Sequence, residues 1–297
     1  MGFFYWYVMQ ALLHSYIGDL FAFDFYLKDD VRTEVTEVVF DLNMSTRVRD
    51  LVPIVFPNLK NIIVCNASQS RAARFEYIKA PREAVLKAFP QLDSDILDLR
   101  QWLNYFWCNP KAFPNIEPMP VSKGVFLTQT LASVKKFKLP AEFILVHPAS
   151  AWSHQPNRDF NLSDLFAVNI LAKRLQLPVV LIGNSNVPLT INKPKRHSVA
   201  TAQAKTVCEK LGWLNYTDQT TKFETLEILK KASIFTGASS CWAVLAAARL
   251  PEKNVLIRPD DHLIREKKLM PYFYPFSTPA IFGDRPLTLA NFDRIQK

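Results

Sequence analysis

The strongest constraint on the fold lies between residues 224 and 259, where the sequence alternates between helix and buried strand. A helix pattern leads into the apolar run Ile234–Thr236, and the small residues Gly237–Ser240 follow directly. An Ala-rich helix pattern and a second apolar run come next. Gly and Ser favour a tight turn from strand to helix, so this segment predicts a strand–turn–helix–strand unit.

The predicted turn is also a candidate anion site. Backbone N–H groups at the first turn of a helix lack intrahelical acceptors and favour negative charge. Gly237, Ser239 and Ser240 are therefore candidate ligands for the diphosphate of a nucleotide. The alternative is an ordinary strand-to-helix turn that a serine caps.

The same alternation extends through both halves of the chain. Residues 109–123 include four prolines, which oppose both helix and sheet interior, so this stretch predicts a linker. Strands that alternate with helices predict parallel sheets. We therefore expect an α/β protein with two Rossmann-like domains whose parallel sheets face a cleft, residues 1–120 and 121–297. The predicted strands are 3–9, 37–41, 61–65, 142–148 and 178–183, and the predicted helices are 95–106, 162–175, 198–211 and 222–232.

Charge is distributed unevenly between the two predicted domains. Residues 1–120 contain 12 Lys and Arg against 14 Asp and Glu, whereas residues 121–297 contain 24 against 13, a net charge of +11. A basic surface attracts nucleotides, nucleic acid and anionic membranes alike, so charge does not choose among them. The four cysteines are far apart and form no metal-ligand spacing, which favours reduced thiols in the cytoplasm.

Four segments of the sequence act as landmarks: Ser15–Leu20, then Ile144–Ser150 with Arg158–Phe160, then Val179–Gly183, and finally Thr225–Ala248. In this order they resemble the lipopolysaccharide heptosyltransferases, a family of glycosyltransferases of the GT-B architecture. The resemblance implies a glycosyltransferase that moves a sugar from a nucleotide-sugar donor to an acceptor hydroxyl. It implies an acceptor in the N-terminal half, a bacterial surface glycan or glycolipid, and a donor in the C-terminal half.

The last landmark departs from the family's pattern. Ser239, Cys241 and Val244 stand where the family usually has Asp, Gly and His. These departures put the identity of the sugar in doubt more than the binding of a nucleotide. They also keep open a non-catalytic module that only binds nucleotide sugars.

The resemblance makes Asp19 the candidate catalytic base. Glycosyl transfer needs a group that takes the proton of an acceptor hydroxyl, and a carboxylate in a cleft can do so. The alternative is that Asp19 is a helix N-cap, and both roles can coexist. His14 and Asp24 are nearby alternative bases.

Further donor contacts are expected around the strand that ends at His147. Arg158 is positioned to neutralise the leaving diphosphate, or it is a solvated surface residue. Ser150 and Trp152 are candidates for lining the donor pocket, as is Gly183 after the next strand. His147 itself is expected to be a hydrogen-bonded core histidine, whereas His154 lies in a polar loop. No cluster of residues with metal-ligand spacing is recognised, so no metal or cofactor is expected beyond the nucleotide sugar.

Lys193, Lys195 and Arg196 are candidate contacts for the acceptor or another polyanion, because they follow a strand end where α/β sheets bind ligands. The basic surface also motivates a phage-type DNA glycosyltransferase that acts on hydroxymethylated pyrimidine bases. It equally fits peripheral contact with an anionic membrane. The apolar start of the chain lacks the features of a signal peptide, so a cytoplasmic location is expected, with peripheral contact at the inner membrane as an option.

Overall fold

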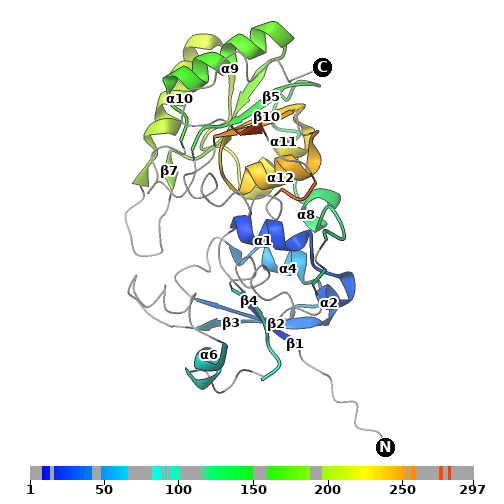
Figure 1. The fold of residues 1–297 in the computed structure, drawn as a ribbon. Helices are drawn as coiled ribbons and strands as arrows, with labels where there is room; N and C mark the ends of the chain where they lie inside the picture. The colour runs from blue at the N-terminus through cyan, green and yellow to red at the C-terminus, as the bar shows by residue number, and fades with distance from the viewer. Residues whose placement is uncertain are drawn as a thin grey trace, which may run out of the picture. The chain divides into compact units, whose positions relative to one another are not determined.

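The computed structural model separates into two compact units, Met1–Val125 and Phe126–Lys297, called unit 1 and unit 2 below (Figure 1). The predicted domain limits 1–120 and 121–297 stay predictions. The structure describes residues 9–13, 17–41, 48–65, 82–88, 90, 92, 94–100, 116–117, 119–149, 159–187, 196–251, 254–258, 274–276 and 280–281.

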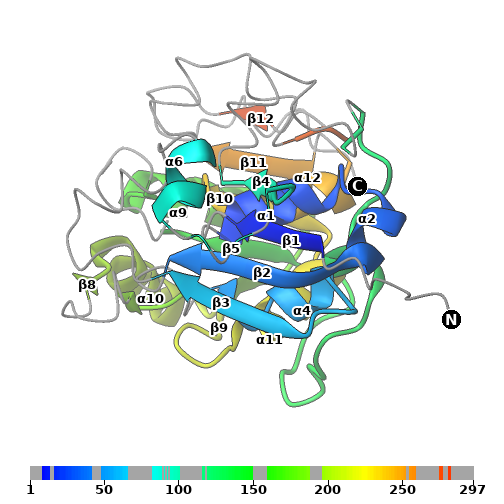
Figure 2. The ribbon, with the colours of Figure 1, turned by 90° about the horizontal axis from the view of Figure 1, so that it is seen from below.

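Unit 1 contains a sheet of four parallel strands in the order β3-β2-β1-β4 (Figure 2). Its core includes Leu12, Val39, Val85, Leu92 and Ile96. The predicted strands at 37–41 and 61–65 are confirmed, whereas of the predicted strand 3–9 only Met9 is described. The strands are β1 (Met9–Leu13), β2 (Val35–Asp41), β3 (Asn61–Cys65) and β4 (Leu97–Leu99); the helices are α1 (Ile17–Asp24), α2 (Asp29–Glu34), α4 (Val52–Val55) and α6 (Arg82–Ala88).

The helix predicted at 95–106 is wrong in its described part, because Leu97–Leu99 forms β4. This strand pairs with β1, and both leucines are buried while Asp98 between them is less so. The spacing of Ile96 and Leu99 fits a helix face, but alternation over Leu97–Leu99 fits a strand equally well. Pairing with the central strand of the sheet decides between the two patterns.

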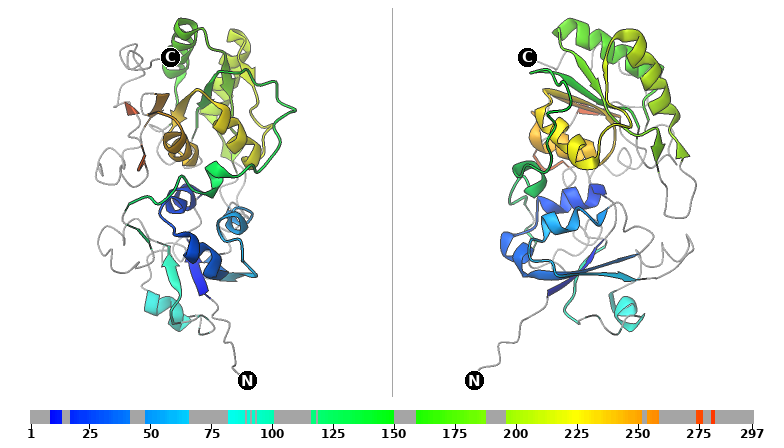
Figure 3. Two further views of the ribbon diagram at one scale, coloured as in Figure 1. Left: turned by 90° about the vertical axis from the view of Figure 1, so that its right-hand side faces the viewer. Right: turned by 180° about the vertical axis from the view of Figure 1, so that it is seen from behind.

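Unit 2 contains a sheet of six parallel strands in the order β12-β11-β10-β5-β6-β9. Helices α9 and α10 cover one face, and α11 and α12 cover the other (Figure 3). A pair of short antiparallel strands, β7 and β8, lies outside this sheet. The strands are β5 (Ile144–His147), β6 (Val179–Leu181), β7 (Asn186–Val187), β8 (Arg196–His197), β9 (Leu214–Asn215), β10 (Ile234–Ala238), β11 (Val255–Arg258) and β12 (Ala280–Ile281); the helices are α8 (Val125–Thr128), α9 (Leu162–Leu175), α10 (Val199–Leu211), α11 (Lys222–Lys231) and α12 (Cys241–Arg249).

Side-chain caps determine where the long helices of unit 2 begin. Asn161 and Asp164 form a capping box at α9, and Thr221 and Glu224 form another at α11. Ser198 caps α10 by accepting a hydrogen bond from the N–H of Thr201 at 3.2 Å. The predicted helices at 162–175, 198–211 and 222–232 are therefore confirmed to within one residue.

Both sheets reverse their strand order next to their first strand. In unit 2 the chain runs from β5 through α9 to β6 on one side, and later returns to β10 on the other side of β5. In unit 1 the first strand, β1, likewise lies between β2 and β4. Ligands of open α/β sheets bind at such switch points, beyond the carboxyl ends of the strands.

Gly237 lies inside β10 and not in the predicted turn, because the strand continues to Ala238. It pairs with His147 of β5, and a Cβ on Gly237 would overlap the carbonyl oxygen of His147. The absence of a side chain here allows β10 to approach β5. The turn itself begins at Ser239.

Gly237→Ala is expected to destabilise unit 2 by at least about 3 kcal/mol, the upper range for overpacking, because the clash involves the backbone of a central strand. Gly212→Ala is the matched control. Gly212 has a φ of +68° but open space around its Cβ position, so only backbone strain of about 1 kcal/mol applies. Urea denaturation measures both variants, and equal losses would contradict the packing role of Gly237.

Candidate functional site

The carboxyl ends of β5 and β10 meet at the switch point of unit 2. His147 ends β5, and Ser239 and Ser240 follow β10. The N–H of Ser239 donates to the carbonyl of Arg258 at 2.8 Å, which fixes the start of the turn to β11. Ser240 is the N-cap residue of α12, and its carbonyl accepts from the N–H of Ala243 at 3.0 Å.

Three buried polar atoms of β5, β10 and the turn have no hydrogen-bond partner within the described part of the chain. They are Nδ1 of His147, Oγ1 of Thr236 and Oγ of Ser240. Ser240 also makes no side-chain cap to α12, although serine usually does so at this position. An unsatisfied buried polar group costs about 1–3 kcal/mol, so such groups mark a place where a ligand can complete the hydrogen bonding.

The ring of His147 is buried against Trp242, the second residue of α12. Their ring centroids are 6.5 Å apart in an edge-to-face arrangement. Burial lowers the pKa of His147 to about 4, so the imidazole is neutral at physiological pH. The prediction of a core histidine is confirmed for its burial, whereas its Nδ1 lacks the hydrogen bond expected of it within the described residues.

The sequence matches no protein-family model, and it matches no curated protein. The structure resembles E. coli ADP-heptose LPS heptosyltransferase II with a TM-score of 0.53 and 14% identity, over 93% of this chain and 90% of that one. The chain has a heptosyltransferase-like fold. This resemblance fits the expected α/β fold with parallel sheets.

Two other solved structures match less well. The family 9 glycosyltransferase from Veillonella parvula matches with a TM-score of 0.49 and 12% identity, over 97% of this chain and 90% of that one. The iron-containing dodecameric glycosyltransferase TibC from enterotoxigenic E. coli matches with 0.43 and 14%, over 82% and 57%. Among the described residues here, no three or more His, Cys, Asp or Glu side chains group together as metal ligands.

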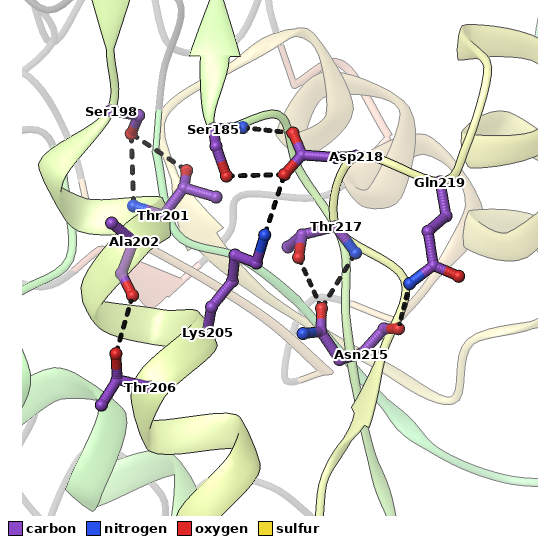
Figure 4. A network of polar contacts seen from close by, with 10 residues as sticks. All are labelled: Ser185, Ser198, Thr201, Ala202, Lys205, Thr206, Asn215, Thr217, Asp218 and Gln219. Atoms are coloured by element: carbon purple, nitrogen blue, oxygen red, sulfur yellow. Dashed lines mark hydrogen bonds and ion pairs between the residues drawn. The ribbon is translucent and has the colours of Figure 1, made fainter.

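A network of hydrogen bonds and one ion pair lies beyond the ends of β6 and β9 in this heptosyltransferase-like fold (Figure 4). The carboxylate of Asp218 accepts from the N–H of Ser185 at 2.6 Å and its hydroxyl at 2.7 Å, and it pairs with Lys205 at 3.1 Å. Burial opposes ionisation of Asp218, but the hydrogen bonds from Ser185 and the charge of Lys205 outweigh it and lower its pKa. This network joins the loops after two strands to α10.

Gly183, a predicted donor contact, lies beside this network. Its φ of +136° favours glycine, and its carbonyl accepts from the N–H of Asp218 at 2.9 Å. Backbone conformation therefore explains Gly183 without a ligand, and its contact with a donor stays a prediction. Sequence inspection missed Ser185 and Asp218, which belong to no motif.

Asp19 is the third residue of α1, directly beyond the switch point of unit 1. The alternative that Asp19 is an N-cap is wrong, because the helix already begins at Ile17. An acidic residue in the first turn still interacts favourably with the helix dipole. The structure does not describe the side chain of Asp19, so its role as the base stays a prediction.

Asp24, an alternative base, is instead a structural residue in the interior of unit 1. It is fully buried and pairs with Arg32 at 2.5 Å, and a Cβ on Gly124 would overlap its carboxylate. The end of β4 carries another ion pair that sequence inspection missed. Arg100 is buried there and binds the carboxylate of Asp98 through two nitrogens at 2.9 and 2.6 Å.

Several predicted site residues fall outside the described residues, and their roles stay predictions. For Arg196 the structure describes only the backbone, which lies in β8. The predicted residues that lie wholly outside the described ranges are His14, Ser150, Trp152, His154, Arg158, Lys193 and Lys195.

The buried His147 predicts a pH dependence of stability. Its pKa is about 4 in the fold and about 6.5 when unfolded, so the unfolded chain binds more protons between these values. Its contribution is complete above about pH 6.5 and is lost progressively as the pH falls to about 4, in total about 3 kcal/mol.

His147→Asn cannot be protonated in this range, so the difference in unfolding free energy between this variant and the wild type should change between pH 7 and pH 4. Urea denaturation at pH 7, 5.5 and 4 measures it. A difference that is constant with pH would contradict the assigned burial of a neutral imidazole.

Proposed function

We propose that the chain is a glycosyltransferase that takes a sugar from a nucleotide-sugar donor bound in unit 2. The observation that carries the proposal is the pair of unpartnered buried polar atoms beside the amino end of α12, Nδ1 of His147 and Oγ of Ser240. It lies at the switch point of a sheet whose fold resembles a heptosyltransferase. Helix N-termini at such points favour phosphate groups.

The donor's diphosphate would lie against the turn of Ser239 and Ser240 at the start of α12. The hydroxyl of Ser240 is available to donate, because it makes no cap within the described structure. The neutral imidazole of His147 offers one donor and one acceptor at the same edge. The solved relative from E. coli is an ADP-heptose enzyme, so ADP-heptose is the first donor to test.

The acceptor would bind to unit 1, with Asp19 as the base. An acceptor hydroxyl oxygen attacks the anomeric carbon, the bond from this carbon to the diphosphate breaks, and Asp19 takes the hydroxyl proton. The similar E. coli structure is named an LPS heptosyltransferase, which favours a glycan or glycolipid acceptor. None of the helices among the described residues combines the length and the hydrophobicity that a membrane-spanning segment needs.

A thermal-shift screen tests the donor. ADP, UDP, GDP, ADP-heptose and UDP-glucose are each added to the full chain at millimolar concentration. A true ligand stabilises the fold by RT ln(1 + [L]/Kd), about 2.7 kcal/mol at a hundredfold excess over Kd. At least one nucleoside diphosphate or its sugar is expected to raise the melting temperature, and no shift with any of them would contradict the proposal.

Ser240→Ala is expected to weaken binding of ADP or the best nucleotide by about 2–12-fold, which corresponds to one hydrogen bond of about 0.5–1.5 kcal/mol. Stability should change little, because the side chain of Ser240 makes no cap hydrogen bond to α12 within the described residues. Ser198→Ala is the matched control at α10, where the serine does cap its helix. That variant should lose about 1 kcal/mol of stability and keep its affinity. Calorimetry and urea denaturation separate the two effects, and the reverse result would relocate the site.

Asp19→Asn is expected to fold, bind donor normally and transfer sugar about 10²–10⁴-fold more slowly, because the amide cannot take a proton. The measurement is release of nucleoside diphosphate in the presence of donor and acceptor glycan. A variant with full activity would show that Asp19 is not the base. A wild-type chain that binds donor but never transfers it would indicate a binding module.

A further inference from the structure

Arg258 ends β11 beside the turn that leads into α12. In the sheet register it is the partner of Ala238, and its carbonyl accepts the N–H of Ser239. The backbone of Arg258 is therefore one hydrogen bond away from the proposed phosphate site. No motif in the sequence pointed to this residue.

The side chain of Arg258 leaves the sheet on the face covered by α9. Leu256, two residues earlier, belongs to the core that packs under α9, and side chains two apart on a strand share a face. Arg258 accordingly forms an ion pair with Asp164, the third residue of α9. Since α9 follows β5, its first turn lies at the same carboxyl edge as the first turn of α12.

The partners of this ion pair differ in exposure. The side chain of Asp164 is 3% exposed, whereas that of Arg258 is 16% exposed. Asp164 also accepts the N–H of Asn161 at 2.8 Å in the capping box, so its position is fixed by the helix. Asp164 thus holds the guanidinium at the edge of the sheet while part of the arginine faces solvent.

We propose that Arg258 binds the diphosphate of a nucleoside diphosphate sugar, and that Asp164 is the residue that positions it. This inference rests on the proposed function. It adds the residue that would neutralise the negative charge of the donor's diphosphate. The cation lies on one face of the sheet, and the unpartnered hydroxyl of Ser240 lies at the start of the helix on the other face. Both residues lie at the carboxyl end of β10, because Arg258 pairs with Ala238 and Ser240 follows Ala238 by two residues, so a diphosphate bound there would contact both.

The chemistry of transfer makes an arginine useful at this place. When the bond between the anomeric carbon and the phosphate oxygen breaks, its electron pair stays on that oxygen. The negative charge of the departing nucleoside diphosphate therefore increases. A guanidinium presents a fork of N–H donors that matches phosphate oxygens, and it stabilises charge that develops in the transition state.

Calorimetry on the full chain tests the inference with ADP, AMP and inorganic pyrophosphate at fixed ionic strength. Arg258→Gln is expected to weaken ADP and pyrophosphate about 10–100-fold, as for loss of a hydrogen bond between charged groups, and AMP clearly less. Asp164→Asn keeps the charge of Arg258 but removes the carboxylate that holds it in place. A smaller loss of affinity for ADP and pyrophosphate is therefore expected. Arg258→Lys keeps the charge without the fork and should fall between wild type and Arg258→Gln.

Lys205→Gln is the matched control, because Lys205 also pairs with a carboxylate at the carboxyl side of this sheet. It is expected to bind ADP within twofold of the wild type. Thermal denaturation verifies that each variant folds. If Arg258→Gln does not fold, the affinity of Arg258→Lys for ADP is the deciding measurement. If the wild type binds ADP and the folded Arg258 variants bind it equally well, the role of Arg258 is overturned. If the wild type binds no nucleoside diphosphate at all, UDP and GDP included, the proposed function falls and this inference with it.

Discussion

The parallel pairing of β10 with β5 is the interaction on which the rest of unit 2 depends. These two strands are the centre of the sheet, and their contact defines the switch point. Gly237 permits the close approach, since its partner's carbonyl occupies the space that a side chain would need. The end of β5, the turn after β10 and the amino end of α12 are all placed by this one register.

Much of the fold could be predicted because its signals are local. The boundaries of α9 follow from an apolar face preceded by Asn161 with Asp164 three residues on, and α11 follows from Thr221 and Glu224 in the same way. The strand β4 could not be predicted, because Ile96–Leu99 fits both periodicities and only its pairing with β1 selects one. The end of β10 could not be predicted either. Glycine favours a turn, and only the packing of β5 against Gly237 keeps this residue in the strand.

The candidate site could be predicted only where residues are close together in the sequence. Ser239 and Ser240 were found because they follow a strand and precede a helix. Arg258 and Asp164 are 94 residues apart, and neither belongs to a recognisable pattern. Asp24 shows the converse error: its charge suggested chemistry, but a partner eight residues later in the sequence holds it in the interior.

The central position of β5 also has a consequence for synthesis of the chain. Ile144 of β5 pairs with Ile234 of β10, so the ribosome must add 90 residues before the first strand of this sheet meets its inner neighbour. At about 5–20 residues per second, this takes on the order of 5–20 s. Throughout that interval one edge of a strand that is fully buried in the finished fold has no partner, and such edges promote association between chains. β6 pairs with the opposite edge of β5 and α9 covers a face, so the arrangement that creates the switch point leaves this edge open until β10 is made, unless a chaperone shields it.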